Sequence, residues 1–133
     1  FERHGKSVTE GNLASFDEAV ACVLRDIHIG EEEFETAAVI TMTEWEAKVL
    51  YRKIQESGTE VSYIDRDSTS FKKGLSVTTF YMAKGLEFDQ VFGVSQMWNA
   101  GFSGQAKYIC ATRALHELYM YEISEDKREK SEK

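Results

Sequence analysis

Residues 77–91 read VTTFYMAKGLEFDQV: a β-run, a short polar loop with one glycine, and a second β-run. Glycine lets the backbone of such a loop turn tightly or approach a ligand closely. Gly85 therefore indicates either a tight turn or a ligand contact at this place. Glu87 stands between two apolar residues whose burial would hold the segment in place. The residues alone allow two interpretations. The loop is either an ordinary connection with solvated Lys84 and Glu87, or one whose carboxylate accepts hydrogen bonds from paired hydroxyls, as on a ribose.

Short apolar runs alternate with helical patterns on both sides of this stretch. Ser15 and Thr43 are each followed three residues later by a glutamate, which is the capping-box pattern, so both predict the start of a helix. Gly30 and Gly58 are expected to end these two helices. The other expectations follow from hydrophobic periodicity: strands at residues 6–9, 37–41, 61–64, 75–80, 90–95 and 118–123, and a helix at 105–115.

Strands that alternate with helices predict an α/β fold, with a mainly parallel sheet and helices on both of its faces. The length of 133 residues suits one domain with its own core, and hydrophobic residues make up 42% of the chain. Ligands of open parallel sheets generally bind beyond the carboxyl ends of the strands. We therefore expect a ligand site at that edge of the sheet.

The charge balance limits the classes of function. The net charge is −7, whereas a free-standing nucleic-acid binder usually carries a basic surface. The composition thus argues against strong DNA binding by this chain alone, although a neighbouring domain could supply a basic groove. No apolar run approaches the roughly 18 residues that a membrane-spanning helix needs, so no membrane partner is expected.

Several side chains that could carry other chemistry have simpler explanations. Cys22 and Cys110 make no disulfide framework and are expected to be buried, reduced thiols, which suits a cytoplasmic protein. No histidine is placed by spacing to activate Cys110, and His116 is expected at the surface or at a helix end. The histidines show no metal-ligand spacing, and the acidic run at 31–35 is expected to be solvated, so no metal site is predicted.

A second motif follows downstream, where residues 108–114 read YICATRA. Taken alone, Arg113 would be interpreted as a surface cation or an ion-pair partner on a helix. Together with the loop, however, this segment resembles motifs V and VI of superfamily 1 helicases of the UvrD/Rep class. The matching residues are Thr79, Ala83, Lys84, Gly85, Leu86, Glu87 and Phe88 in the first motif, and Tyr108, Ala111, Thr112, Arg113, Ala114 and Leu118 in the second.

The resemblance implies roles for five residues. Glu87 would hold the ribose of ATP on the loop that contains Gly85, and Arg113 would be the catalytic arginine that reaches the γ-phosphate across a cleft between two domains. A guanidinium suits this place because it is always charged and offers forked donors to phosphate oxygens. Thr79 and Tyr81 would face single-stranded DNA and the partner domain. Tyr81 stands where the family usually has histidine, a variant similar to the HelD or helicase IV-like branch, and tyrosine can still donate a hydrogen bond or stack on a base.

The resemblance also implies the architecture. Residues 1–124 would form the second RecA-like domain (P-loop NTPase-like) of a larger motor, and residues 125–133 a charged, disordered tail. No Gly-x-x-x-x-Gly-Lys-Ser/Thr string occurs, so the Walker A loop and the ligands of Mg²⁺ would belong to an N-terminal RecA-like domain of the same protein. The chain begins at Phe1 rather than at a methionine, and we interpret it as a piece of a larger protein. Alone, it is expected to have no ATPase activity.

Three functions follow from these observations. The leading hypothesis is the second motor domain of an ATP-dependent DNA helicase or translocase, an ATP hydrolase. The alternative is a domain of a HelD-like factor that uses ATP to remodel RNA polymerase, because an acidic domain suits a protein partner better than bare DNA. The third is a nucleotide-binding α/β domain without a motor role.

Overall fold

The computed structural model describes residues 7–27, 29, 34–65, 73–96 and 103–124. Several expected features lie outside these ranges: residue Gly30 itself, most of the acidic run and the tail at 125–133. Within them, strands and helices alternate as expected. The elements are β1 (Ser7–Leu13), α1 (Phe16–Asp26), β2 (Thr36–Thr41), α2 (Glu44–Glu56), β3 (Ser62–Tyr63), β4 (Gly74–Thr79), β5 (Phe88–Ser95), α3 (Ser103–Arg113) and β6 (Ala114–Ile123).

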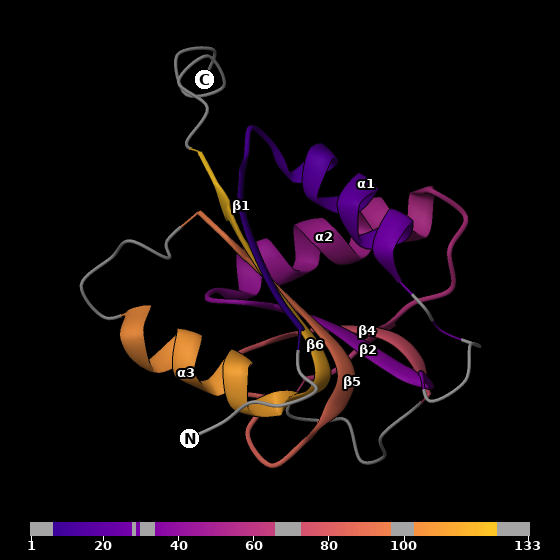
Figure 1. Ribbon diagram of the computed structural model, residues 1–133. Helices are drawn as coiled ribbons and strands as arrows, with labels where there is room; N and C mark the ends of the chain where they lie inside the picture. The colour runs from indigo at the N-terminus through magenta and orange to yellow at the C-terminus, as the bar shows by residue number, and fades with distance from the viewer. Residues whose placement is uncertain (1–6, 28, 30–33, 66–72, 97–102, 125–133) are drawn as a thin grey trace.

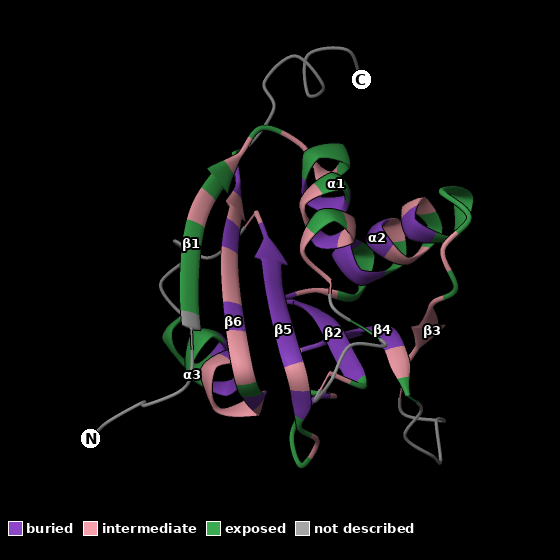
Figure 2. Ribbon diagram, turned by 45° about the vertical axis from the view of Figure 1, so that its right-hand side comes forward, coloured by how far each residue is buried: buried purple, intermediate pink, exposed green. Residues whose placement is uncertain are grey.

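The strands form one sheet in the order β1-β6-β5-β2-β4-β3, and every pair in it is parallel. Figure 2 shows these strands side by side, with the central strands buried and β1 largely exposed. Every residue of β2 is buried, as expected for a strand that is covered on both faces. β1 is longer than the expected 6–9 because it pairs with β6 along its whole length. The predicted α/β class with a parallel sheet is confirmed.

Helices cover both faces of the sheet: α1 and α2 lie on one side and α3 lies on the other (Figure 1). Successive residues of a strand point to opposite faces of the sheet, so each strand contributes to the core on both faces. In β2, Ala37 and Val39 pack with α1 and α2, whereas Ala38 and Ile40 pack with α3. The loop between β4 and β5 adds Ala83 to the α3 layer. The chain therefore crosses from β4 to β5 along the α3 face, through a loop rather than a helix.

Local signals place the starts of α1 and α2. Thr43 and Glu46 form the predicted capping box of α2, since each side chain accepts a hydrogen bond from the backbone N–H of the other, at 3.2 and 3.3 Å. Ser15 caps α1 as expected. The expected return contact from Glu18 to the Ser15 amide is wrong, because the carboxylate reaches one residue further and accepts from Ala14 at 2.9 Å.

The ends of these two helices differ. α2 stops as expected, because Gly58 follows it with a φ of +92°, a left-handed conformation that glycine adopts at little cost. α1 stops at Asp26, and the backbone of Ile27 is already extended. The predicted end at Gly30 is therefore too late for the α-helix itself.

The junction between α3 and β6 bears directly on the candidate site. Hydrophobic periodicity predicts a helix that runs to Leu115, but the helix ends at Arg113 and β6 begins with the next residue. Ala114 already pairs with Phe88 of β5, so a partner in the sheet ends the helix. Arg113 therefore lies at a helix–strand junction, directly before the first residue that pairs in the sheet.

Candidate functional site

Glu87 and Arg113 lie at the starts of two neighbouring strands. Glu87 directly precedes β5, Arg113 directly precedes β6, and the first residues of the two strands, Phe88 and Ala114, are paired. Neighbouring strands are about 4.8 Å apart, so the two side chains leave the backbone from adjacent positions at one edge of the sheet. This is the lower edge in Figure 2, from which β5 and β6 start.

This edge is the amino edge of the sheet, whereas the ligand site was expected beyond the carboxyl ends of the strands. The loop after β4 and the helix α3 each carry the chain back along the sheet before the next parallel strand begins. A residue that directly precedes a parallel strand therefore lies at the amino end of that strand. The general rule for ligands of open α/β sheets does not describe Glu87 and Arg113.

Both side chains are accessible and have few partners. Glu87 is exposed and Arg113 is half-buried. The Nε of Arg113 donates to the hydroxyl of Thr112 at 3.3 Å, and that hydroxyl donates to the carbonyl of Ile109 at 3.0 Å. Within the described part of the chain, the Glu87 carboxylate and the terminal nitrogens of Arg113 make no hydrogen bond or ion pair. A carboxylate and a forked cation thus remain available at one edge.

Gly85 is needed for a tight turn rather than for a close approach of the backbone to a ligand. Its φ is +85°, and the Leu86 N–H donates to the carbonyl of Ala83 at 3.0 Å, which is the pattern of a type II turn with glycine at its third residue. A Cβ added to Gly85 would meet no atom within 4 Å, so the backbone conformation is what requires glycine. Because Ala83 is fully buried, the core anchors this turn immediately before Glu87.

Thr79 and Tyr81 lie away from Glu87 and Arg113, and they differ from each other in exposure. Thr79 is the last residue of β4 and lies at the carboxyl edge, away from Glu87 and Arg113. Its side chain is 1% exposed, and its hydroxyl has no hydrogen-bond partner among the residues that the structure describes. Tyr81 is 41% exposed, and its ring lies edge-on to that of Phe80 with 5.4 Å between the centroids. Of the two residues predicted to face DNA, Tyr81 is accessible, whereas the sheet encloses Thr79.

Comparison with known proteins bears on the fold. No protein-family model and no curated protein matches the chain. The C-terminal domain of a possible DNA helicase from Lactobacillus plantarum WCFS1 is 24% identical, with a TM-score of 0.74 over 90% of this chain and 76% of that one. Arterivirus nonstructural protein 10, a helicase solved in complex with DNA, is 14% identical, with a TM-score of 0.57 over 89% of this chain and 28% of that one. The fold is RecA-like.

The RecA-like sheet places two further residues beside Glu87 and Arg113. Asp89 accepts hydrogen bonds through Oδ2 from the backbone N–H groups of Glu35 and Thr36, at 2.7 and 3.1 Å. Its Oδ1 lies 3.6 Å from the Nε2 of His116. The sequence does not single out Asp89. His116 lies in β6 rather than at a helix end, but its side chain is 39% exposed, so the expected surface position agrees with the structure in part. The available signal for Asp89 was a carboxylate at the start of an apolar strand, but its partners, Glu35 just before β2 and Thr36 at its start, are 54 and 53 residues away.

Cys110 lies in the α3 layer of the RecA-like domain. Burial raises the pKa of its thiol to about 12, because the low-dielectric core disfavours the thiolate. The thiolate is the nucleophilic form of cysteine, so the expectation that Cys110 is a poor nucleophile agrees with its surroundings. Cys22 is also a free thiol but is half-buried rather than buried.

Thiol chemistry provides a first test. At pH 8 the Cys110 thiol stays protonated, because burial raises its pKa to about 12. We expect iodoacetamide to modify Cys22 in the folded protein and to modify Cys110 only after denaturation. Peptide mapping by mass spectrometry measures both sites in one sample. Equal labelling of Cys110 with and without denaturant would contradict its burial.

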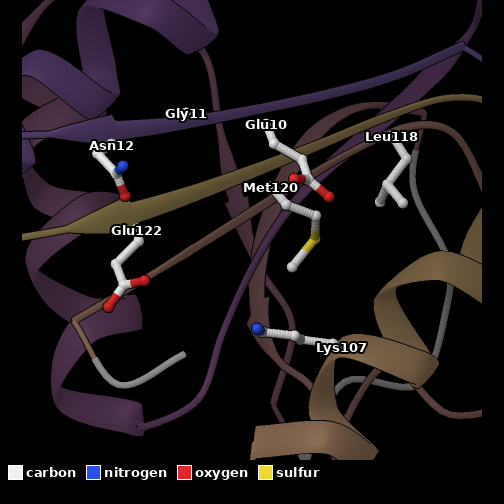
Figure 3. Close-up of a pocket in the computed structure, with 7 residues that line it drawn as sticks. All are labelled: Glu10, Gly11, Asn12, Lys107, Leu118, Met120 and Glu122. Atoms are coloured by element: carbon white, nitrogen blue, oxygen red, sulfur yellow. The ribbon is translucent and has the colours of Figure 1, made fainter. Parts of the chain in front are cut away.

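A cavity of about 500 Å³ opens on the same face as α3. Figure 3 shows that its polar lining includes two carboxylates, an amide and one ammonium. None of the residues predicted to bind nucleotide or nucleic acid lines it, so it is separate from the candidate site. The lining residues are Glu10, Gly11, Asn12, Lys107, Leu118, Met120 and Glu122.

The described residues lack two kinds of feature. They contain no group of three His, Cys, Asp or Glu side chains that could hold a metal ion. Their helices include none that is long and apolar enough to cross a membrane.

Proposed function

We propose that this chain is the second motor domain of an ATP-dependent DNA helicase or translocase of the UvrD/Rep class, in its HelD or helicase IV-like branch. The observation that carries the proposal is the pairing of Phe88 with Ala114, because it brings Glu87 and Arg113 to one edge. The motif resemblance covers both residues. A domain named as part of a possible DNA helicase shares the fold. Backbone geometry and sequence pattern therefore support the proposal independently.

The two side chains suit different parts of a nucleotide. An exposed carboxylate such as that of Glu87, which has no partner among the residues that the structure describes, can accept hydrogen bonds from the two hydroxyls of a ribose. Arg113 can donate two hydrogen bonds to the oxygens of the γ-phosphate and stabilise the charge that develops on them during phosphoryl transfer. Thr112 holds the Nε of Arg113, which leaves both terminal nitrogens for the phosphate.

The chain would supply one wall of the ATP site. The sequence has no Walker A string. The phosphate-binding loop and the Mg²⁺ ligands would therefore come from an N-terminal RecA-like domain. Glu87 and Arg113 would draw the two domains together around a nucleotide and let them separate after hydrolysis. Tyr81, at the opposite edge, offers an exposed ring on which a base of the DNA strand could stack.

The net charge of −7 favours a second candidate function. In this alternative, the domain belongs to an ATP-driven factor that binds RNA polymerase. ATPase assays on the two-domain protein, with single-stranded DNA or with RNA polymerase added, separate the two candidates. Stimulation by DNA together with strand displacement supports the leading proposal, and capture of polymerase without a DNA response supports the alternative. The isolated 133-residue chain is expected to show no turnover in either assay.

Replacing Glu87 with alanine is expected to raise the KM for ATP by about 10- to 100-fold, which corresponds to the loss of hydrogen bonds to a charged group. The kcat should change little, because a ribose contact is made equally in the ground state and the transition state. Steady-state kinetics on the two-domain protein measure both constants.

Two comparisons make this test specific. Glu56→Ala removes an exposed carboxylate from the end of α2 and should leave the KM unchanged. A preference of the unaltered protein for ATP over 2′-deoxy-ATP should shrink in Glu87→Ala, because the variant no longer recognises the ribose hydroxyls. An unchanged KM and an unchanged preference would remove Glu87 from the nucleotide site.

A further inference from the structure

The first residues of β5 and β6 are not in regular register. Between the first and second residue pairs of these strands, one residue of β5 faces two residues of β6. The single residue is Asp89, and the two are Leu115 and His116. This two-against-one arrangement is that of a β-bulge, which interrupts the hydrogen-bond ladder and changes the direction of nearby side chains. The bulge lies within three residues of both Glu87 and Arg113.

The Asp89 carboxylate links the amino ends of three strands. It is 14% exposed and accepts three hydrogen bonds at the start of β2, from the Glu35 N–H at 2.7 Å, the Thr36 N–H at 3.1 Å and the Thr36 hydroxyl at 3.3 Å. The Asp89 N–H donates in return to the Thr36 hydroxyl at 2.9 Å. Its other oxygen faces β6 and the Nε2 of His116 at 3.6 Å.

His116 is held between a charge and a ring. The distance of 3.6 Å to Asp89 is too long for a hydrogen bond, and the carboxylate attracts the imidazole when the ring is protonated. The imidazole also packs against the ring of Phe34, with 5.4 Å between the centroids. These two contacts fix the bulged segment of β6 at the place where ladder hydrogen bonds are interrupted.

We propose that Asp89 and His116 are positioning residues for the nucleotide site. The carboxylate fixes the start of β5, the imidazole fixes the bulge in β6, and together they set the spacing between Glu87 and Arg113. This inference rests on the proposed function, since the spacing matters for a nucleotide that both residues contact. Neither Asp89 nor His116 needs to touch the nucleotide.

Two substitutions at His116 test the inference in the protein that contains both motor domains. His116→Phe keeps a ring against Phe34 but removes the nitrogen that faces Asp89. We expect its kcat for ATP to fall by about 10- to 100-fold, as for a misplaced catalytic group. The Kd for a fluorescent, non-hydrolysable ATP analogue should rise about tenfold. His116→Gln restores a nitrogen donor but neither the charge nor the ring, so it should recover only part of both losses.

Lys53→Ala is the matched control. It removes a shorter ion pair, that of Lys53 with Asp17 at 2.8 Å, which joins α1 to α2 away from the site. Neither kcat nor the Kd should change in this variant. The melting temperatures of all these variants should stay close to that of the unaltered protein, because the proposal concerns spacing and not stability.

A second background separates positioning from a general structural role. Arg113→Lys already lacks the forked guanidinium, so adding His116→Phe to it should lower kcat by less than about twofold further, since the two effects are coupled. Equal losses in both backgrounds, or a His116→Phe variant with unchanged kcat and Kd, would overturn the positioning role while leaving the proposed function intact. Unchanged turnover in Arg113→Lys alone would overturn both.

Discussion

Replacing Arg113 with alanine is expected to lower the kcat for ATP of the two-domain protein by about 10³- to 10⁵-fold, the range for arginines that act on a transferring phosphoryl group. The guanidinium would donate to oxygens whose charge grows in the transition state, so its loss affects kcat more than nucleotide binding. The fold should persist, because Arg113 is half-buried and its described hydrogen bond is to its neighbour Thr112. Turnover at saturating ATP, with circular dichroism of the same samples, measures both effects.

Two variants serve as controls for Arg113→Ala. Arg113→Lys keeps the positive charge but loses the planar fork, so an intermediate loss of kcat is expected. Arg52→Ala removes an exposed arginine from α2, which lies on the opposite face of the sheet from α3, and should leave turnover unchanged. Near-normal turnover in Arg113→Ala would exclude the catalytic role. A loss in Arg52→Ala would show that the assay reports a general defect.

Replacing Phe92 with alanine is expected to lower the free energy of unfolding by about 3–5 kcal/mol. Phe92 is fully buried in β5, and its ring stacks on that of Tyr119 with 4.5 Å between the centroids. Truncation removes the burial of a large side chain and leaves a cavity between the sheet and the helices α1 and α2, which the rigid core fills incompletely. Urea denaturation of the 133-residue chain measures the change.

Leu115→Ala is the matched control for Phe92→Ala. Leu115 is a large apolar residue of β6, the strand next to β5, but it is 46% exposed, so its truncation should change the free energy of unfolding by about 0.5 kcal/mol or less. A loss of less than about 1 kcal/mol in Phe92→Ala would mean that the core around β5 is not closely packed.

Local sequence signals predicted much of the secondary structure. The capping box of Thr43 and Glu46 was predictable because its members are three residues apart and bond to each other's backbone. The buried strand β2 was predictable because every residue in it is covered on both faces. Contacts with another strand moved the boundaries that were missed. β1 extends to Leu13 through its pairing with β6, and α3 ends where Ala114 meets Phe88.

The candidate site was predictable in part. The motif pattern identified Glu87 and Arg113, and the structure places them at neighbouring strand starts. The pattern could not show that Thr79 is enclosed by the sheet, because its burial depends on the order of the strands around β4. The link between Asp89 and His116 was equally hidden, since it joins residues from different strands.

The sequence by itself determined where the helices α1 and α2 begin and which side chains are candidates for the chemistry, because caps and motifs depend on neighbours within a short segment. The tertiary structure alone decided that Glu87 and Arg113 share the amino edge, that Tyr81 is accessible and Thr79 is not, and that a bulge lies beside the site. These features arise when strands that are far apart in the chain pair in a particular order. That order follows from the packing of the whole sheet, which no local segment encodes.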